Sequence, residues 1–166
     1  MVTLGFDAST TCVGWSYVSD EKIIDAGYID ISKFETPKEK TYAVLDSLSD
    51  KRVPERINIE APLSGFSGGR TSQQVIIQLV RFNAIFEYIL TDKFYPVPIH
   101  LVNVNTARKS LFGKARVKGI KSKDYVKQEI EKRFDTSKWV HINRAGNFDK
   151  KNIDMYDAIV LACYDK

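Results

Sequence analysis

Four carboxylates occupy places where the surrounding sequence is apolar or changes direction. Asp7 follows the short apolar run of residues 2–6, and Glu60 ends an alternating segment just before an Ala-Pro pair. Asp154 and Asp157 lie three residues apart, so a helix would place both on one face. The sequence NIDMYDAIVLACY continues from this pair into an apolar stretch, which indicates that the face is turned toward the core.

The chemistry open to these side chains depends on whether the four of them meet. Carboxylates that converge in a partly buried site repel one another strongly unless a cation neutralises them. Oxygen ligands without His or Cys favour Mg²⁺, with Mn²⁺ as a substitute, over zinc. Two such ions about 4 Å apart can stabilise both the attacking and the leaving oxygen of a phosphodiester hydrolysis. Each residue alone also has an ordinary explanation, as a turn cap or a solvated side chain, and only the combination is specific.

The elements that must position the carboxylates follow from hydrophobic periodicity. Apolar and alternating segments predict a three-stranded meander over residues 2–31 and further strands at 56–60 and 99–104. Amphipathic spacing and cap residues predict five helices, namely Pro37 to near Asp50, 73–90 after a Thr71 or Ser72 cap, a short one capped at Asn105-Thr106, 122–134 and 152–164. We expect a single α/β domain over residues 1–166, with a mixed sheet flanked by helices.

Composition limits the class of protein but does not identify it. The chain has 25 basic and 21 acidic residues among 166, a net charge of +4, so any case for nucleic acid must rest on where the charge lies. Cys12 and Cys163 are far apart and lack neighbours at metal-ligand spacing, which favours a reducing compartment. The first residues lack a basic export segment and a long apolar run, so we expect a cytoplasmic protein with no membrane contact, in a host cytosol if it is viral.

Basic residues concentrate in one segment, 105–123, which reads NTARKSLFGKARVKGIKSK and contains no acidic residue. An acidic centre that cuts DNA needs such a basic rim, because it would otherwise repel its polyanionic substrate. The alternative is a solvated basic loop. The predicted DNA contacts in this segment are Arg108, Lys109, Lys114, Arg116, Lys118, Lys121 and Lys123.

Two further regions are candidates for contact with DNA. The segment 64–72, SGFSGGRTS, suits a loop over a substrate, and its Arg70 can bind phosphate, although an ordinary connection is equally consistent with it. His141 lies in a polar region and is either a surface residue or a DNA contact, whereas His100 begins an apolar strand and is expected to be structural. Neither histidine is assigned a catalytic role.

The order of these motifs resembles one family over nearly the whole chain. GFDASTTCVGWS, INIEAP and NIDMYDAIVLA are similar to the RuvC-like Holliday junction resolvases of the ribonuclease H-like superfamily, and the short, divergent chain suits a phage or virus type. The resemblance implies a five-stranded mixed sheet flanked by helices, and a Mg²⁺-dependent endonuclease that nicks four-way DNA junctions as a homodimer. It implies that the four catalytic, metal-binding carboxylates are Asp7, Glu60, Asp154 and Asp157.

The resemblance is incomplete at several positions. The chain has Ala-Pro after Glu60, where bacterial members tend to have Gln and then an aromatic residue that probes the junction centre. Phe66 is our candidate for that wedge, and Lys109 and Lys123 fall nearest the family's DNA-contacting positions. The predicted helix at 73–90 has more apolar faces than one sheet needs, so it is the candidate dimer interface.

Two other classes of protein stay open at this point. The opening Asp-x-Ser-Thr-Thr also resembles the phosphate-binding hairpin of sugar kinases and actin-like ATPases, which need a second domain that 166 residues do not supply. A non-catalytic nucleic-acid-binding module that kept the fold is the other alternative. Within the nuclease hypothesis, the residues do not distinguish junctions from forks, flaps or RNA–DNA hybrids.

Overall fold

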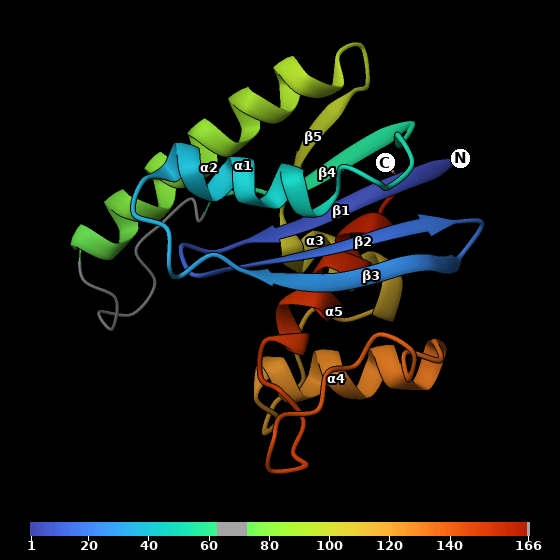
Figure 1. Ribbon diagram of the computed structural model, residues 1–166. Helices are drawn as coiled ribbons and strands as arrows, with labels where there is room; N and C mark the ends of the chain where they lie inside the picture. Colours follow the sequence, from blue (N-terminus) through green and yellow to red (C-terminus); the bar gives the residue numbers. More distant parts are fainter. Residues whose placement is uncertain (63–72, 166) are drawn as a thin grey trace.

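The structure is a computed structural model that describes residues 1–62 and 73–165 (Figure 1). The bounds of the elements within these ranges are β1 (Val2–Ala8), β2 (Cys12–Ser19), β3 (Lys22–Asp30), α1 (Pro37–Ser47), β4 (Arg56–Glu60), α2 (Gln73–Phe94), β5 (Ile99–Val102), α3 (Val104–Phe112), α4 (Ser122–Arg133) and α5 (Asn152–Ala162).

The strands form one mixed sheet in the order β3-β2-β1-β4-β5. β1, β2 and β3 pair antiparallel as the predicted meander, because short turns join them. β4 and β5 are parallel to the strands they adjoin, β1 and β4, since α1 and α2 provide the crossover connections. The predicted α/β architecture, a five-stranded mixed sheet flanked by helices, is confirmed.

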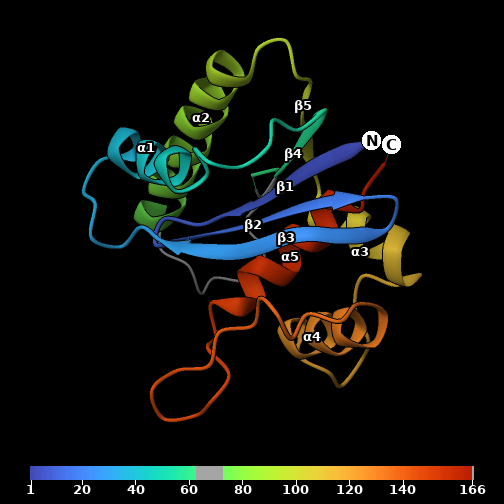
Figure 2. The same ribbon diagram turned by 45° about the vertical axis from the view of Figure 1, so that its right-hand side comes forward.

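Helices cover both faces of this sheet, with α1 and α2 on one face and α3, α4 and α5 on the other (Figures 1 and 2). Along β1, Leu4 and Phe6 pack into the core with α1 and α2. Because side chains alternate along a strand, Gly5 and Asp7 face α5 instead. The alternation of side chains along β1 therefore places the first carboxylate on the α5 face.

Two glycines let α5 lie directly on the sheet. A Cβ atom at Gly5 would lie 2.2 Å from the carbonyl oxygen of Ala158, and one at Gly14 would lie 2.0 Å from that of Asp154. Any side chain at either position would push the helix away from β1 and β2. Since Gly14 pairs with Asp7 in the sheet, this close approach sets the start of α5 beside the end of β1.

Element boundaries differ from the predicted ones by a few residues. The capping box at Thr36 and Glu39 forms as its sequence suggests, but α1 ends at Ser47 rather than near Asp50. Asn103, not Asn105-Thr106, caps α3, because its side-chain oxygen accepts from the backbone N–H groups of residues 105 and 106. Strand β5 accordingly ends at Val102. Among the described helices, none combines the length and apolarity that a membrane crossing requires.

Candidate active site

The sheet contributes two of the four carboxylates from adjacent parallel strands. Phe6 of β1 is in register with Ile59 of β4, so Asp7 and Glu60 are the next residues along on each strand. Ile57 and Ile59 pack toward α1 and α2, which turns Glu60 toward the α5 face. Asn58, on that same face, donates to the carbonyl oxygens of Leu161 and Tyr164 at 2.8 Å each and so ties β4 to α5.

Helix α5 contributes the other two carboxylates from its first turns. Asp154 is partly buried beside β2, and Asp157 is buried with 7% of its surface exposed. The residues between and after them, from Met155 to Leu161, are almost all fully buried. The core-facing helix predicted from NIDMYDAIVLACY is therefore present, and it turns Asp157 inward rather than to solvent.

Electrostatics shows that these carboxylates lie within range of one another. The pKa of Asp7 is raised well above its usual value, first by burial, then by a hydrogen bond with Glu60 and by repulsion from Asp157. Burial is also the main cause that raises the pKa of Asp157 to about 6, and nearby Arg108 opposes it. Burial raises the pKa of Asp154 too, while a hydrogen bond with Cys12 and the charge of Lys123 lower it. Two strands and one helix thus gather negative charge at one end of the sheet.

Arg108 of α3 is the cation inside this group. Its Nη2 donates to both oxygens of Asp157, at 2.7 and 2.8 Å, and its Nε donates to Oδ1 at 3.0 Å. Its Nη1 donates to Ser122 Oγ at 2.8 Å. Arg108 is 7% exposed, so its guanidinium is held inside the protein, unlike the surface position we expected for a DNA contact. The sequence does not reveal this pairing, because the basic residues around Arg108 hide the one that turns inward.

The four carboxylates do not form a closed metal cage by themselves. Among residues 1–62 and 73–165, no three His, Cys, Asp or Glu side chains are grouped as metal ligands. Arg108 donates to both oxygens of Asp157, and the Cys12 side chain forms a hydrogen bond with Asp154. Cys12 is a neighbour that sequence reasoning missed, since a lone cysteine carries no spacing signal.

The other basic residues predicted to contact DNA lie between α3 and α4 or on those helices. Gly113 and Gly119, with φ of 80° and 85°, shape the connection. Lys123 is the member close enough to Asp154 to lower its pKa. Exposed side chains in this region are those of Lys109, Lys114, Arg116, Lys118, Lys121 and Lys123. Phe66 and Arg70, the predicted wedge and loop contact, lie outside the described residues.

Comparison with known proteins gives likenesses of structure only, since no protein-family model and no curated protein matches the chain. RuvC of Thermus thermophilus, in complex with a Holliday junction substrate, has a TM-score of 0.62 and 16% identity, over 98% of this chain and 90% of that chain. The yeast mitochondrial Holliday junction resolvase Ydc2 has a TM-score of 0.60 and 17% identity, over 96% and 75%.

A viral protein extends the same likeness. Fowlpox virus resolvase, in complex with Holliday junction DNA, has a TM-score of 0.55 and 15% identity, over 98% of this chain and 94% of that chain. The chain has the RuvC-type resolvase fold. The predicted resemblance is thus confirmed at the level of the fold, and the site described above occupies one end of its central sheet.

Proposed function

We propose that this protein is a structure-selective endonuclease that hydrolyses phosphodiester bonds in four-way DNA junctions. The observation that carries the proposal is the group formed by Asp7, Glu60, Asp154 and Asp157, in which each strand and helix supplies a carboxylate to one electrostatically linked site. Three solved structures with this fold are Holliday junction resolvases, and two of them contain junction DNA. The fold and the acidic site therefore support the same activity.

We propose a divalent cation at this site, Mg²⁺ with Mn²⁺ as a substitute, because the available donors are all carboxylate oxygens. Burial and mutual repulsion raise the pKa of Asp7, so the ionised form is unfavourable until positive charge is added. The side chains that would hold the cation are those of Asp7, Glu60 and Asp154, and Asp157 would hold it only in place of its contact with Arg108. When bound, such ions supply the positive charge that stabilises the attacking and leaving oxygens of the phosphodiester.

The chain's own residues would hold and orient the DNA around this site. The exposed lysines and Arg116 between α3 and α4 provide positive charge for phosphates next to the carboxylates, and Lys123 is already within range of Asp154. Arg108 keeps Asp157 oriented by its bidentate contact.

We further propose that the protein acts as a homodimer through α2. One face of this helix is buried through Phe82, Phe86 and Leu90. The opposite face exposes Ile77, Val80 and Tyr88, at 59%, 45% and 75% of their surfaces. These positions are three and eight residues apart, so they form an apolar stripe suited to a second copy of the helix. Two copies would bring two acidic sites to one junction for paired nicks.

A nicking panel tests the proposal. Wild-type protein is incubated with four-way junctions, forks, flaps and RNA–DNA hybrids of one sequence, with Mg²⁺, Mn²⁺ or Ca²⁺, and the cut positions are mapped. We expect paired, symmetric cuts in the junction with Mg²⁺ or Mn²⁺. Glu60→Gln should abolish cutting and retain junction binding, while Asp46→Asn, at an exposed carboxylate on α1, should cut normally.

Other outcomes would separate the alternatives. Tight ATP binding without nicking would favour the kinase-like or actin-like class. DNA binding with no cutting in any metal would favour a non-catalytic module. A monomer in sedimentation, with and without junction DNA, would contradict the paired-nick mechanism.

A further inference from the structure

A segment beside the acidic site has no role so far. Residues 141–150, which we call the hairpin, connect the region after α4 to the start of α5, and Ile142 pairs antiparallel with Phe148. It extends away from the sheet as a narrow loop near the first turn of α5 (Figures 1 and 2). The hairpin lies two residues upstream of α5, the helix that contributes Asp154 and Asp157.

The tip of the hairpin is built from its own hydrogen bonds. The Asn143 side-chain oxygen accepts from the backbone N–H groups of Ala145 and Asn147, at 3.0 Å each. The backbone N–H of Asn143 donates to Asn147 at 2.8 Å, and that of Gly146 donates to Asn143 at 2.9 Å. Gly146 has φ of 78°, where glycine is favoured. Arg144 is therefore presented on a defined turn.

The base of the hairpin is fastened to α5. Asn152, the first residue of α5, is fully buried. Its side-chain oxygen accepts from the backbone N–H of His141 at 2.9 Å, and its side-chain nitrogen donates to the His141 carbonyl oxygen at 2.7 Å. The backbone N–H of Asp149 donates to the same His141 carbonyl at 3.1 Å. The hairpin and the helix that contributes two carboxylates are thus one unit.

Strand β3 holds the base from the other side. The Tyr28 hydroxyl donates to Asp149 at 2.9 Å, and its ring lies 4.9 Å from the His141 ring. Tyr28 pairs with Gly14, which pairs with Asp7, so all three stand in one row across the sheet. Strands are about 4.8 Å apart, which places the Tyr28 backbone about 10 Å from that of Asp7. The base of the hairpin is thus fastened to β3, two strands away from Asp7 in β1.

The hairpin has two positively charged side chains that form no ion pair within the described ranges. Arg144 and Lys150 are exposed, and within the described ranges neither has an ion-pair partner. Asp149, its one carboxylate, accepts from the backbone N–H of Lys151 and from the Tyr28 hydroxyl, and these hydrogen bonds lower its pKa. The next lysine, Lys151, pairs with Asp30. Two cations therefore remain for an external anion.

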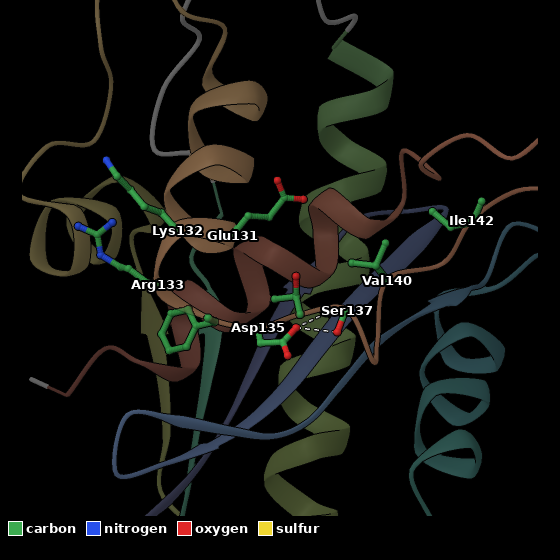
Figure 3. A pocket seen from close by; sticks show the side chains of 9 residues that line it. Glu131, Lys132, Arg133, Asp135, Ser137, Val140 and Ile142 are labelled. Atoms are coloured by element: carbon green, nitrogen blue, oxygen red, sulfur yellow. Dashed lines mark hydrogen bonds between the residues drawn. The ribbon is translucent and has the colours of Figure 1, made fainter.

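The neighbouring hollow is a poorer place for an anion. It measures about 670 Å³ between the end of α4 and the stem of the hairpin, where Val140 and Ile142 line it (Figure 3). Glu131 and Asp135 line it together with Lys132 and Arg133, so charge of both signs is present. The exposed tip and Lys150, in contrast, carry only positive charge.

We propose that the hairpin is a DNA-backbone clamp, in which Arg144 and Lys150 bind phosphates outside the bond that is cut. The inference rests on the proposed nuclease function and adds a second contact surface to it, separate from the basic residues between α3 and α4. Because the hairpin is fastened to α5, phosphates bound there are held at a fixed distance from Asp154 and Asp157. The clamp positions the substrate and takes no part in the chemistry.

The test removes the two charges and measures binding against salt. Arg144→Gln/Lys150→Gln is compared with the wild type and with Lys22→Gln/Lys93→Gln, a control at two exposed lysines on β3 and α2. Junction affinity is measured in Ca²⁺ by fluorescence anisotropy from 50 to 300 mM salt. Losing two phosphate contacts should reduce the slope of log K against log salt by about 1.8 and weaken binding about 30-fold at 0.15 M salt. Hydroxyl-radical footprints should lose protection at phosphates outside the cut, while protection at the cut itself remains.

Each result decides one question. An unchanged slope and footprint in the Arg144/Lys150 variant, with normal binding and cutting by the wild type, would overturn the clamp and leave the nuclease proposal standing. Failure of the wild type to bind or cut any branched DNA would overturn both. Equal losses in the Lys22/Lys93 control would show a general charge effect and overturn the clamp. Thermal unfolding of all variants checks that the exposed substitutions leave the fold intact.

Discussion

The acidic site has two halves that differ in how their charge is balanced. In the helix half, burial raises the pKa of both carboxylates, but Arg108 opposes this at Asp157, and Cys12 and Lys123 oppose it at Asp154. In the sheet half, Asp7 and Glu60 meet each other, and their contact raises the pKa of Asp7 further. A protein that only needed stability would not keep this second arrangement, because it stores repulsion. We therefore place the proposed cation in the sheet half.

The largest expected effect comes from changing the sheet half. Asp7→Asn should lower the rate of junction nicking by about a thousandfold or more, because a ligand for the activating cation is lost. The same change should raise the melting temperature in EDTA, since it removes a repelling charge. Nicking assays and calorimetry measure the two effects. A variant that cuts normally, or one that is less stable in EDTA, would contradict the account of this half.

Removing a charge from the helix half should lower the stability of the protein rather than raise it. Arg108→Met leaves the buried Asp157 carboxylate without a partner, so we expect a loss of about 3–5 kcal/mol in the free energy of unfolding. Denaturant titration measures the loss. The double variant Arg108→Met/Asp157→Leu should recover most of it, because both buried charges are then absent. If the double variant is as unstable as the single one, the ion pair is not what stabilises this half.

A divalent cation should stabilise the protein mainly through the carboxylates of the sheet half. At a concentration a hundred times its dissociation constant, Mg²⁺ should add about 2.7 kcal/mol to the stability of the wild type. Glu60→Gln should lose most of this gain, whereas Asp46→Asn should keep it. Melting curves in EDTA and in rising Mg²⁺ provide the measurement. Equal gains in both variants would place the cation away from the sheet half.

The positions of the four carboxylates could be predicted from the sequence, whereas the contacts that balance their charge could not. Asp7 and Glu60 could be placed because strand ends and Ala-Pro breaks are local signals, and Asp154 and Asp157 because helical spacing is local too. The same periodicity located the strands along the chain, and the family resemblance implied a five-stranded mixed sheet. The partner of Asp157 could not be predicted, because residue 108 lies 49 positions away and contact across elements leaves no local trace.

The hairpin illustrates the same limit. Its fastening depends on Asn152 and Tyr28, which reach it from α5 and from β3. Sequence inspection gave His141 only as a polar surface residue or DNA contact. Asn143 and Gly146 are turn residues that local rules do favour, so the shape of the tip is predictable while the attachment of the hairpin to α5 and β3 is not.

The smallest expected effect comes from an ion pair at the surface, which sharpens the contrast with Arg108 and Asp157. Lys151 pairs with Asp30 while both remain about two-fifths exposed, and the contact lowers the pKa of Asp30. A lowered pKa contributes stability above the unfolded value of about 3.9, and that stability is lost as the pH falls below it. Asp30→Asn should therefore cost about 0–1 kcal/mol at pH 7 and nothing near pH 1. Unfolding at several pH values would measure this, and a loss as large as that of Arg108→Met would show that burial does not set the strength of these pairs.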